Sequence, residues 1–342
     1  MSRPGAYLSA VRQLRRHRWR RLAANAAIGA LAPTLALAGS TAAAAAPAVP
    51  GFTVSIPVGN GPAWLAADSR TGTVYVANYS ANTVSVISGR TNTVTATIGV
   101  GDAPNGVAVN SRTDTAYVTN TSSNTVSVIS GQTNTAAIRV GSGPVGLAVN
   151  PRTGTVYVAN YYADTVSVLN GQANTVTATI DVGSGPAEVA VNPVTGTVYV
   201  ANYDADSVSV INGRTNTVTA TITGPGFDYP DGIAANPVTG AVYVANYASN
   251  TVSVISGQTN RVTATIGVGS GPSGVAANPV TGAVYVANYA SNTVSVISGW
   301  WTGMVTATIP AGGGPVAVAV DPSTGAVWVA DNSTNSVLRI SG

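Results

Sequence analysis

One twenty-two-residue stretch occurs twice in this chain, and it constrains the fold more than any other feature. NPVTGAVYVANYASNTVSVISG runs from Asn236 to Gly257 and runs again, without a change, from Asn278 to Gly299. Looser copies precede and follow these two, and the aromatic residue before the Val-Ala-Asn word marks seven copies at spacings of 40 to 44 residues. The seven aromatic residues are Tyr75, Tyr117, Tyr157, Tyr199, Tyr243, Tyr285 and Trp328. Such a short repeat cannot bury its own apolar faces, so neighbouring copies must stack.

Each copy contains four short segments rich in Val, Thr, Ile and Tyr, separated by Gly, Pro, Asn and Ser. This composition is typical of β-strands joined by tight turns, and the turn word Asn-Pro-x-Thr-Gly, as at Asn150, favours a turn that Gly closes. Thr95 and Thr97 alternate with apolar residues, as expected of a half-exposed outer strand, whereas residues 107–109 are apolar on both faces. The sequence therefore predicts an all-β fold, a seven-bladed β-propeller of four-stranded blades.

The two ends of the repeated region predict how the ring closes. The last copy stops at its third strand, near Ile340, whereas the segment from Thr53 to Ile56 precedes the first copy and matches the fourth-strand word. We expect this N-terminal strand to complete the last blade, because that pairing covers two open sheet edges at once.

The first forty-five residues have the pattern of a secretory signal peptide. Seven Arg lie between Met1 and Arg21, an apolar segment follows to Gly39, and small residues from Ser40 to Ala46 precede Pro47. A membrane anchor is the alternative, but Asn25 and Pro33 interrupt an apolar run shorter than the roughly 20 residues that a spanning helix needs. We expect residues 1–45 to be cleaved, by Sec or Tat export, and residues 46–342 to form a secreted or cell-surface propeller without a membrane span.

The charge and composition of the mature chain exclude several function classes. Eight Arg remain against twelve Asp and Glu, which leaves a net charge of eight minus twelve, or −4. Nucleic acid is therefore not an expected partner, since its phosphates are normally bound by a basic patch. The mature chain has no Cys or Lys, and the one His is in the leader, so a Ser-His-Asp triad and a histidine metal site are both excluded. We expect no cofactor and no catalytic residue, with Ca²⁺ on carboxylates as the open possibility.

The repeat also resembles a known family. Tyr117-Val118-Thr119-Asn120 spells the word that names the YVTN family of β-propeller repeats, and Tyr157-Val158-Ala159-Asn160 is similar. The resemblance extends from about residue 52 to the end and implies an exported or surface-layer propeller similar to YncE-type periplasmic proteins. Single-stranded DNA binding, which the YncE likeness suggests, is at odds with the acidic mature chain. Lactonases and a streptogramin lyase belong to the wider group, but the histidine on which that lyase relies has no counterpart here.

Departures from the repeat give the candidate site residues. Inner strands open with Gly or Ala in most copies, but with Trp64 in the first and with Glu188, the chain's one Glu, in the fourth. The connection between the fourth and fifth blades is longer than the others and carries four further candidates. These are Phe227, Asp228, Tyr229 and Asp231. On one interpretation, Trp64 fills the channel, Glu188 is a solvated carboxylate, and the longer loop is sequence divergence between blades. On the other, these residues form a cluster of carboxylates and aromatic rings suited to a cation or a sugar.

Three other sets of residues carry weaker hypotheses. Tyr79, Tyr161, Tyr203, Tyr247 and Tyr289 recur on the predicted candidate rim, either to stack on a ligand or to cover the blades. The Asn before each of these positions is predicted to make turn hydrogen bonds. Trp300 and Trp301 interrupt a turn on the opposite rim and are predicted to be a partner surface.

The sequence thus favours an exported module that binds or scaffolds a protein or a cell-wall polysaccharide. A lactonase-like enzyme that uses Glu188, Asp228 and Asp231 around a divalent cation is one alternative. A structural surface-layer subunit is another.

Overall fold

The structure, a computed structural model, describes residues 52–298 and 303–340. They belong to one compact unit, Pro50–Gly342. The predicted signal peptide and the predicted partner residues Trp300 and Trp301 lie outside the described residues. In the described part, no helix is long and apolar enough to cross a membrane.

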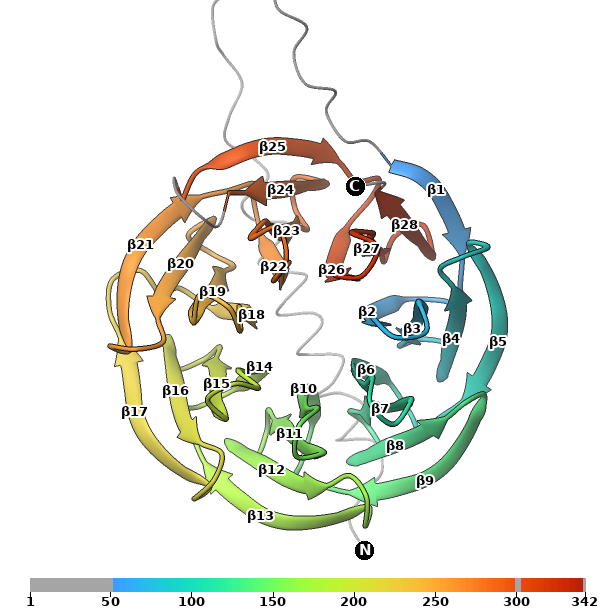
Figure 1. Cartoon of the computed structure of the whole chain (residues 1–342), viewed down its shortest axis with the longest axis horizontal. Helices are drawn as coiled ribbons and strands as arrows, with labels where there is room; N and C mark the ends of the chain where they lie inside the picture. The colour runs from blue at the N-terminus through green and yellow to red at the C-terminus, as the bar shows by residue number, and fades with distance from the viewer. Residues whose placement is uncertain (1–51, 299–302, 341–342) are drawn as a thin grey trace, which may run out of the picture. The chain divides into compact units, whose positions relative to one another are not determined.

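Seven four-stranded antiparallel sheets form a closed ring, as predicted (Figure 1). Blade 1 consists of β2 Pro62–Asp68, β3 Thr73–Asn78, β4 Thr83–Ser88 and β5 Thr93–Gly99. Blade 2 consists of β6 Pro104–Asn110, β7 Thr115–Asn120, β8 Thr125–Ser130 and β9 Thr133–Arg139. Blade 3 consists of β10 Pro144–Asn150, β11 Thr155–Asn160, β12 Thr165–Asn170 and β13 Thr175–Asp181. Blade 4 consists of β14 Pro186–Val191, β15 Thr197–Asn202, β16 Ser207–Asn212 and β17 Thr217–Thr223.

Blades 5 to 7 continue the same order around the ring. Blade 5 consists of β18 Pro230–Ala235, β19 Ala241–Asn246, β20 Thr251–Ser256 and β21 Arg261–Gly267. Blade 6 consists of β22 Pro272–Ala277, β23 Val284–Asn288, β24 Thr293–Ile297 and β25 Val305–Pro310. Blade 7 consists of β26 Pro315–Val320, β27 Val327–Asp331, β28 Ser336–Ile340 and, from the other end of the chain, β1 Phe52–Pro57.

The predicted closure is confirmed by the pairing of β1 with β28. The two strands are antiparallel, with Ser55 opposite Leu338 and Ile56 opposite Val337. Ile56 is buried with Leu65 and Trp328 in the apolar cluster between blades 7 and 1. The N-terminal strand therefore supplies both the fourth strand of blade 7 and part of the core between blades 7 and 1.

An apolar cluster fills each of the seven interfaces between blades. Between blades 1 and 2, for example, Tyr75 packs with Val107 and Val118, and it is 2% exposed. The equivalent tyrosines also make polar contacts with the next blade, since the Tyr117 hydroxyl donates to the Gly171 carbonyl at 3.1 Å. Stacking of this kind explains why the inner strands are apolar on both faces.

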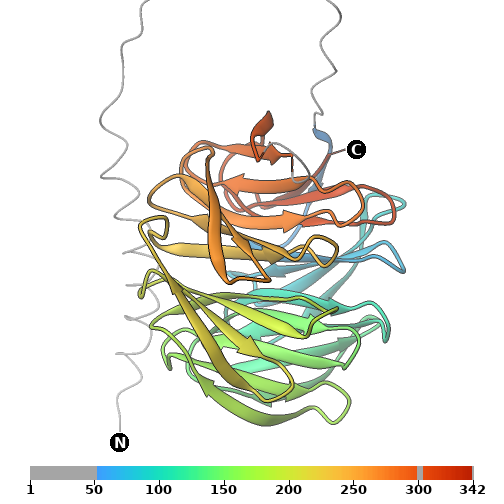
Figure 2. The same cartoon turned by 60° about the vertical axis from the view of Figure 1, so that its left-hand side comes forward.

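The strand ends form two rims, which Figure 2 shows from the side. On the upper rim, the loop between the second and third strands of a blade meets the loop before its inner strand, as where the Tyr79 N–H donates to the Gly61 carbonyl at 2.9 Å. On the lower rim, the first–second turn meets the third–fourth turn, as where the Gly89 N–H donates to the Gly72 carbonyl at 2.9 Å. Loops of opposite rims are thus separated by the length of a strand.

A repeated side-chain hydrogen bond joins neighbouring blades on the upper rim. Asn82 Oδ1 of blade 1 accepts from the N–H of Ala103 before blade 2 at 2.9 Å, and Asn335 Oδ1 of blade 7 accepts from Gly61 at 2.8 Å. The seven acceptors are Asn82, Asn124, Asp164, Asp206, Asn250, Asn292 and Asn335. All seven have positive φ, between 46° and 59°, which Asn and Asp tolerate better than other side chains do. Each bond contributes about 1 kcal/mol to closing the ring.

Candidate functional site

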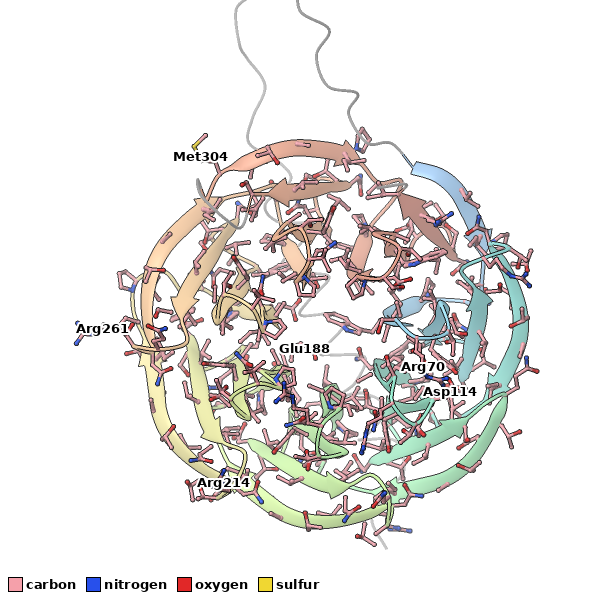
Figure 3. The ribbon with its side chains drawn as sticks, in the orientation of Figure 1. Arg70, Asp114, Glu188, Arg214, Arg261 and Met304 are labelled. Atoms are coloured by element: carbon pink, nitrogen blue, oxygen red, sulfur yellow. The ribbon has the colours of Figure 1, made fainter. Side chains whose placement is uncertain are left out.

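Polar side chains interrupt the apolar repeat at the upper ends of three adjacent inner strands. Glu188 is on β14, Asp231 on β18 and Ser273 on β22, and all three side chains are buried. Figure 3 shows Glu188 toward the middle of the ring. Three neighbouring blades therefore bring a glutamate, an aspartate and a hydroxyl to one side of the channel mouth.

The Glu188 side chain of blade 4 packs against blade 3 at Gly146, which has no side chain to obstruct it. A Cβ on Gly146 would lie 2.7 Å from the Glu188 carboxyl carbon, so no side chain fits at that position without a shift. Glu188 is only 6% exposed, and its Oε1 accepts from the Val189 N–H at 3.1 Å. Burial, helped by the charge of Asp231 and opposed by backbone hydrogen bonds, raises the pKa of Glu188 to about 8. With this pKa, Glu188 is largely protonated at neutral pH and can donate a hydrogen bond.

Asp231 makes a polar contact between blades 5 and 6. It is 5% exposed, and its Oδ2 accepts from the Ser273 hydroxyl at 2.7 Å. Glu188 and Asp231, both named as candidate site residues from the sequence, are close enough to interact electrostatically.

Tyr229 occupies a backbone position that the other blades reserve for small residues. Its φ is 52°, in the left-handed region, where five of the equivalent positions have Gly and blade 2 has Ala103. The Tyr229 N–H donates to Asp206 Oδ1 at 2.8 Å, and its ring lies 4.9 Å from the ring of Tyr203 with planes tilted by 37°. An aromatic residue in this conformation is strained by about 1–3 kcal/mol, which is typical of functional sites.

The other rim tyrosines divide into two groups. Tyr161 donates to Asp204 Oδ2 at 2.8 Å and makes an edge-to-face contact with Tyr162, which is 38% exposed. Tyr289 instead lies over Gly314, where an added Cβ would be 3.0 Å from its ring, and so covers the next blade's loop. The equivalent tyrosines therefore differ in their surroundings, and on blades 3 and 4 their contacts include a carboxylate and other aromatic rings.

Two candidate site residues pack against apolar clusters, and the repeated amides make hydrogen bonds at their turns. Phe227 is 5% exposed and belongs to the apolar cluster between blades 4 and 5, so its ring is part of the core. Trp64 packs against the cluster between blades 7 and 1. The repeated amides, such as Asn78, donate to hydroxyls of the third strand, Thr83 at 3.1 Å and Ser85 at 2.9 Å, in addition to a backbone turn bond. Asp228 is half-buried in the loop before β18.

A carboxyl pair on the lower rim was not found from the sequence. Asp68 of blade 1 is fully buried, and it interacts with Asp114 of blade 2, which also pairs with Arg70 at 3.7 Å. Burial, with a hydrogen bond and charge repulsion from Asp68, raises the pKa of Asp114, whereas Arg70 lowers it. Burial and the two aspartates raise the pKa of Tyr75 to about 12. The available signal was the Asp at a turn position that is Asn in most other copies.

No group of three or more His, Cys, Asp or Glu side chains that could hold a metal ion occurs among the described residues. Two small clefts lie between blades on the lower rim, one beside Gly196 and Gly257 and one beside Gly154 and Gly171.

Comparison with known proteins gives the fold. No family model matches the chain, and no curated protein matches it. A chain of the solved structure of Kuenenia stuttgartiensis hydrazine synthase is similar, with a TM-score of 0.75 and 19% identity over 89% of this chain and 99% of that chain. At this identity the likeness shows the β-propeller fold alone, and the specific resemblance to YVTN repeats stays an expectation from the motif.

Proposed function

We propose that this protein is an exported binding module of the YVTN type, located at the cell surface or outside the cell, whose ligand is a cell-wall polysaccharide. Export rests on the signal-like leader, and the ligand class rests on the upper mouth of blades 4 to 6. The observation that carries it is the combination of two buried side chains, the protonated Glu188 and the hydrogen-bond acceptor Asp231, with the strained Tyr229 ring beside Tyr203.

The chemistry of this mouth suits a sugar chain. A pyranose offers hydroxyls to donors and acceptors and a flat C–H face to aromatic rings. Glu188 supplies a donor and Asp231 an acceptor, and the paired rings of Tyr203 and Tyr229 supply the apolar surface. A protein partner that inserts polar and aromatic side chains is the other class that the mouth accommodates, and the binding test separates the two.

The experiment is titration calorimetry of the purified chain with cell-wall polysaccharide and, separately, with proteins of the extracellular fraction. Tyr229→Gly is the decisive variant, because Gly occupies the equivalent left-handed position in five blades and removes the ring without disturbing the loop. We expect it to keep or raise the thermal midpoint and to weaken polysaccharide binding roughly tenfold or more, the loss of one stacked ring. Tyr247→Thr is the matched control, since blade 2 has Thr121 at that position. Equal affinity in wild type and Tyr229→Gly would refute the site.

One observation favours a second candidate, an enzyme of lactonase type. A carboxyl group with a pKa near neutrality is suited to acid–base catalysis, and Glu188 is such a group. This candidate predicts that Ca²⁺ binds to the chain and that Glu188→Ala abolishes the binding. Ca²⁺-independent polysaccharide binding that survives chelation would favour the binding module.

A further inference from the structure

The first–second turns of the lower rim divide into a basic half and an apolar half. The middle residue of the first–second turn differs from blade to blade while the turn around it is retained. In chain order this residue is Arg70, Arg112, Arg152, Val194, Val238, Val280 and Ser323. Three consecutive blades thus present Arg and the next three present Val. The valines are 56%, 63% and 69% exposed, which makes them unusually accessible for large apolar side chains.

Residues at the third–fourth turns add three Arg, one on blade 1 and two on blades that carry Val. Arg90 and Arg214 lie on third–fourth turns, Arg261 begins β21 directly after such a turn, and all three are exposed. Met304, directly before β25 in blade 6, is 61% exposed. Figure 3 shows Arg214, Arg261 and Met304 at the outer edge of the ring. Six exposed Arg therefore lie on the lower rim, where Asp114 is the one partly exposed carboxylate among the described residues.

The upper rim has the opposite charge. Exposed aspartates lie on its loops and at the adjoining strand ends of blades 2 to 4. They are Asp102, Asp164, Asp181, Asp204 and Asp206. Arg139 is the one exposed Arg on the described part of this rim, and Tyr162 adds an exposed ring. The net charge of −4 conceals this separation, in which acids and aromatics lie at one end of the ring and Arg with aliphatic side chains at the other.

We infer that the propellers associate head to tail, with the lower rim of one copy on the upper rim of the next. Arg then faces Asp, and the exposed Val and Met side chains are covered by the next copy. A contact between two different faces of the chain is heterologous. Such contacts build open chains of copies, unless the rotation from one copy to the next closes a ring. Single exposed ion pairs contribute little, but complementary faces with several charges steer association and fix its register. The contact uses the exposed outer loops, and it does not require the ligand proposed for the channel mouth.

The test is sedimentation velocity on the full chain at a series of concentrations. At about 20 mM salt we expect the average mass to rise with concentration, and at about 500 mM salt we expect it to return toward the monomer, because the screening length shortens several-fold. Two charge-reversed variants probe the two faces. The lower-rim variant carries Arg112→Glu and Arg152→Glu, and the upper-rim variant carries Asp102→Arg and Asp181→Arg. Each alone should reduce association roughly tenfold or more.

Mixing the two variants supplies the decisive control. In the mixture, the reversed upper rim of one variant meets the reversed lower rim of the other, and the two remaining native rims also complement each other. Chains in which the two variants alternate should therefore form, whereas a mixture that stops at the heterodimer would contradict charge pairing between the reversed rims. The apolar half is probed by Val238→Ser with Val280→Ser, which blade 7 already accommodates as Ser323, and this change should weaken association without moving the thermal midpoint.

Monomeric wild type at every salt and concentration would overturn the inference, as would association that neither reversal affects. Binding of an anionic polymer, such as polyphosphate, to a wild-type chain that stays monomeric would also overturn it and would assign the basic half to a polyanion. None of these outcomes changes the expectation for polysaccharide at the mouth, which Tyr229→Gly tests separately.

Discussion

Replacing Glu188 by Gln should remove a pH dependence that burial imposes on the stability of the propeller. The unfolded chain releases the Glu188 proton near the ordinary value of 4.5, whereas the folded protein retains it until a pKa of about 8. Between these values the folded state binds more protons than the unfolded state, so the free energy of unfolding falls as the pH rises. The stability associated with the protonated carboxyl is complete below pH 4.5 and is lost as the pH passes 8.

The magnitude follows from the size of the shift. Each pH unit between the two pKa values changes the free energy of unfolding by about 1.36 kcal/mol. From pH 5 to pH 8 the Glu188 contribution therefore falls by about 3.5 kcal/mol, once partial titration at both ends is included. Gln has nearly the same shape and does not ionise, so Glu188→Gln should lose this part of the pH profile.

Urea unfolding, followed by tryptophan fluorescence at pH 5, 6.5 and 8, measures the effect as a difference between wild type and Glu188→Gln. We expect that difference to move by about 3.5 kcal/mol in favour of Gln across the range, with little change in the denaturant slope. Asp181→Asn is the control, because it removes an exposed carboxylate from the same rim. Parallel profiles for wild type and Glu188→Gln would show that the carboxyl is not held protonated by burial, and the donor role assigned to it would fail.

Three further changes test other parts of the structure. Deleting Phe52–Pro57 removes the whole β1–β28 ladder and should lower the thermal midpoint far more than deleting a loop of equal length; equal midpoints would contradict closure. Asp114→Asn keeps a residue that tolerates positive φ and removes a carboxyl whose raised pKa reflects burial and Asp68, so the variant should be more stable than wild type above neutral pH and similar to it in acid. A pH-independent difference in denaturation midpoint would count against the pair. Replacing Trp300 and Trp301 by Gln and Thr should change stability by roughly half a kcal/mol or less, and a large loss by calorimetry would make them core residues.

The fold could be predicted from the sequence because its determinants are local and repeated. The alternation at Thr95 and Thr97 and the turn word at Asn150 each specify a short element, and seven copies leave stacking as the way to bury them. Closure was also predictable, since the strand missing after Ile340 has its match near Thr53.

Contacts between blades were harder to predict, because they join residues about forty positions apart. Asp68 and Asp114 have no local pattern that pairs them, and Phe227 looked like a loop aromatic although its ring fills a core cluster. The left-handed backbone of Tyr229 was accessible in principle, because the repeat aligns it with Gly in five other blades.

Departure from a repeat does not by itself identify a functional residue, and Thr119 shows why. It stands where the other blades have Ala, yet it is fully buried, accepting from the Gly106 N–H at 2.8 Å and donating to the Val145 carbonyl at 2.6 Å. Its polar atom is satisfied by the interface between two blades, so the substitution is explained by packing. Glu188 differs, because its surroundings keep a proton on a carboxyl beside Asp231 at a channel mouth. The useful criterion in a repeat protein is therefore whether the neighbouring blades satisfy the chemistry of the departing side chain or leave it available to a partner.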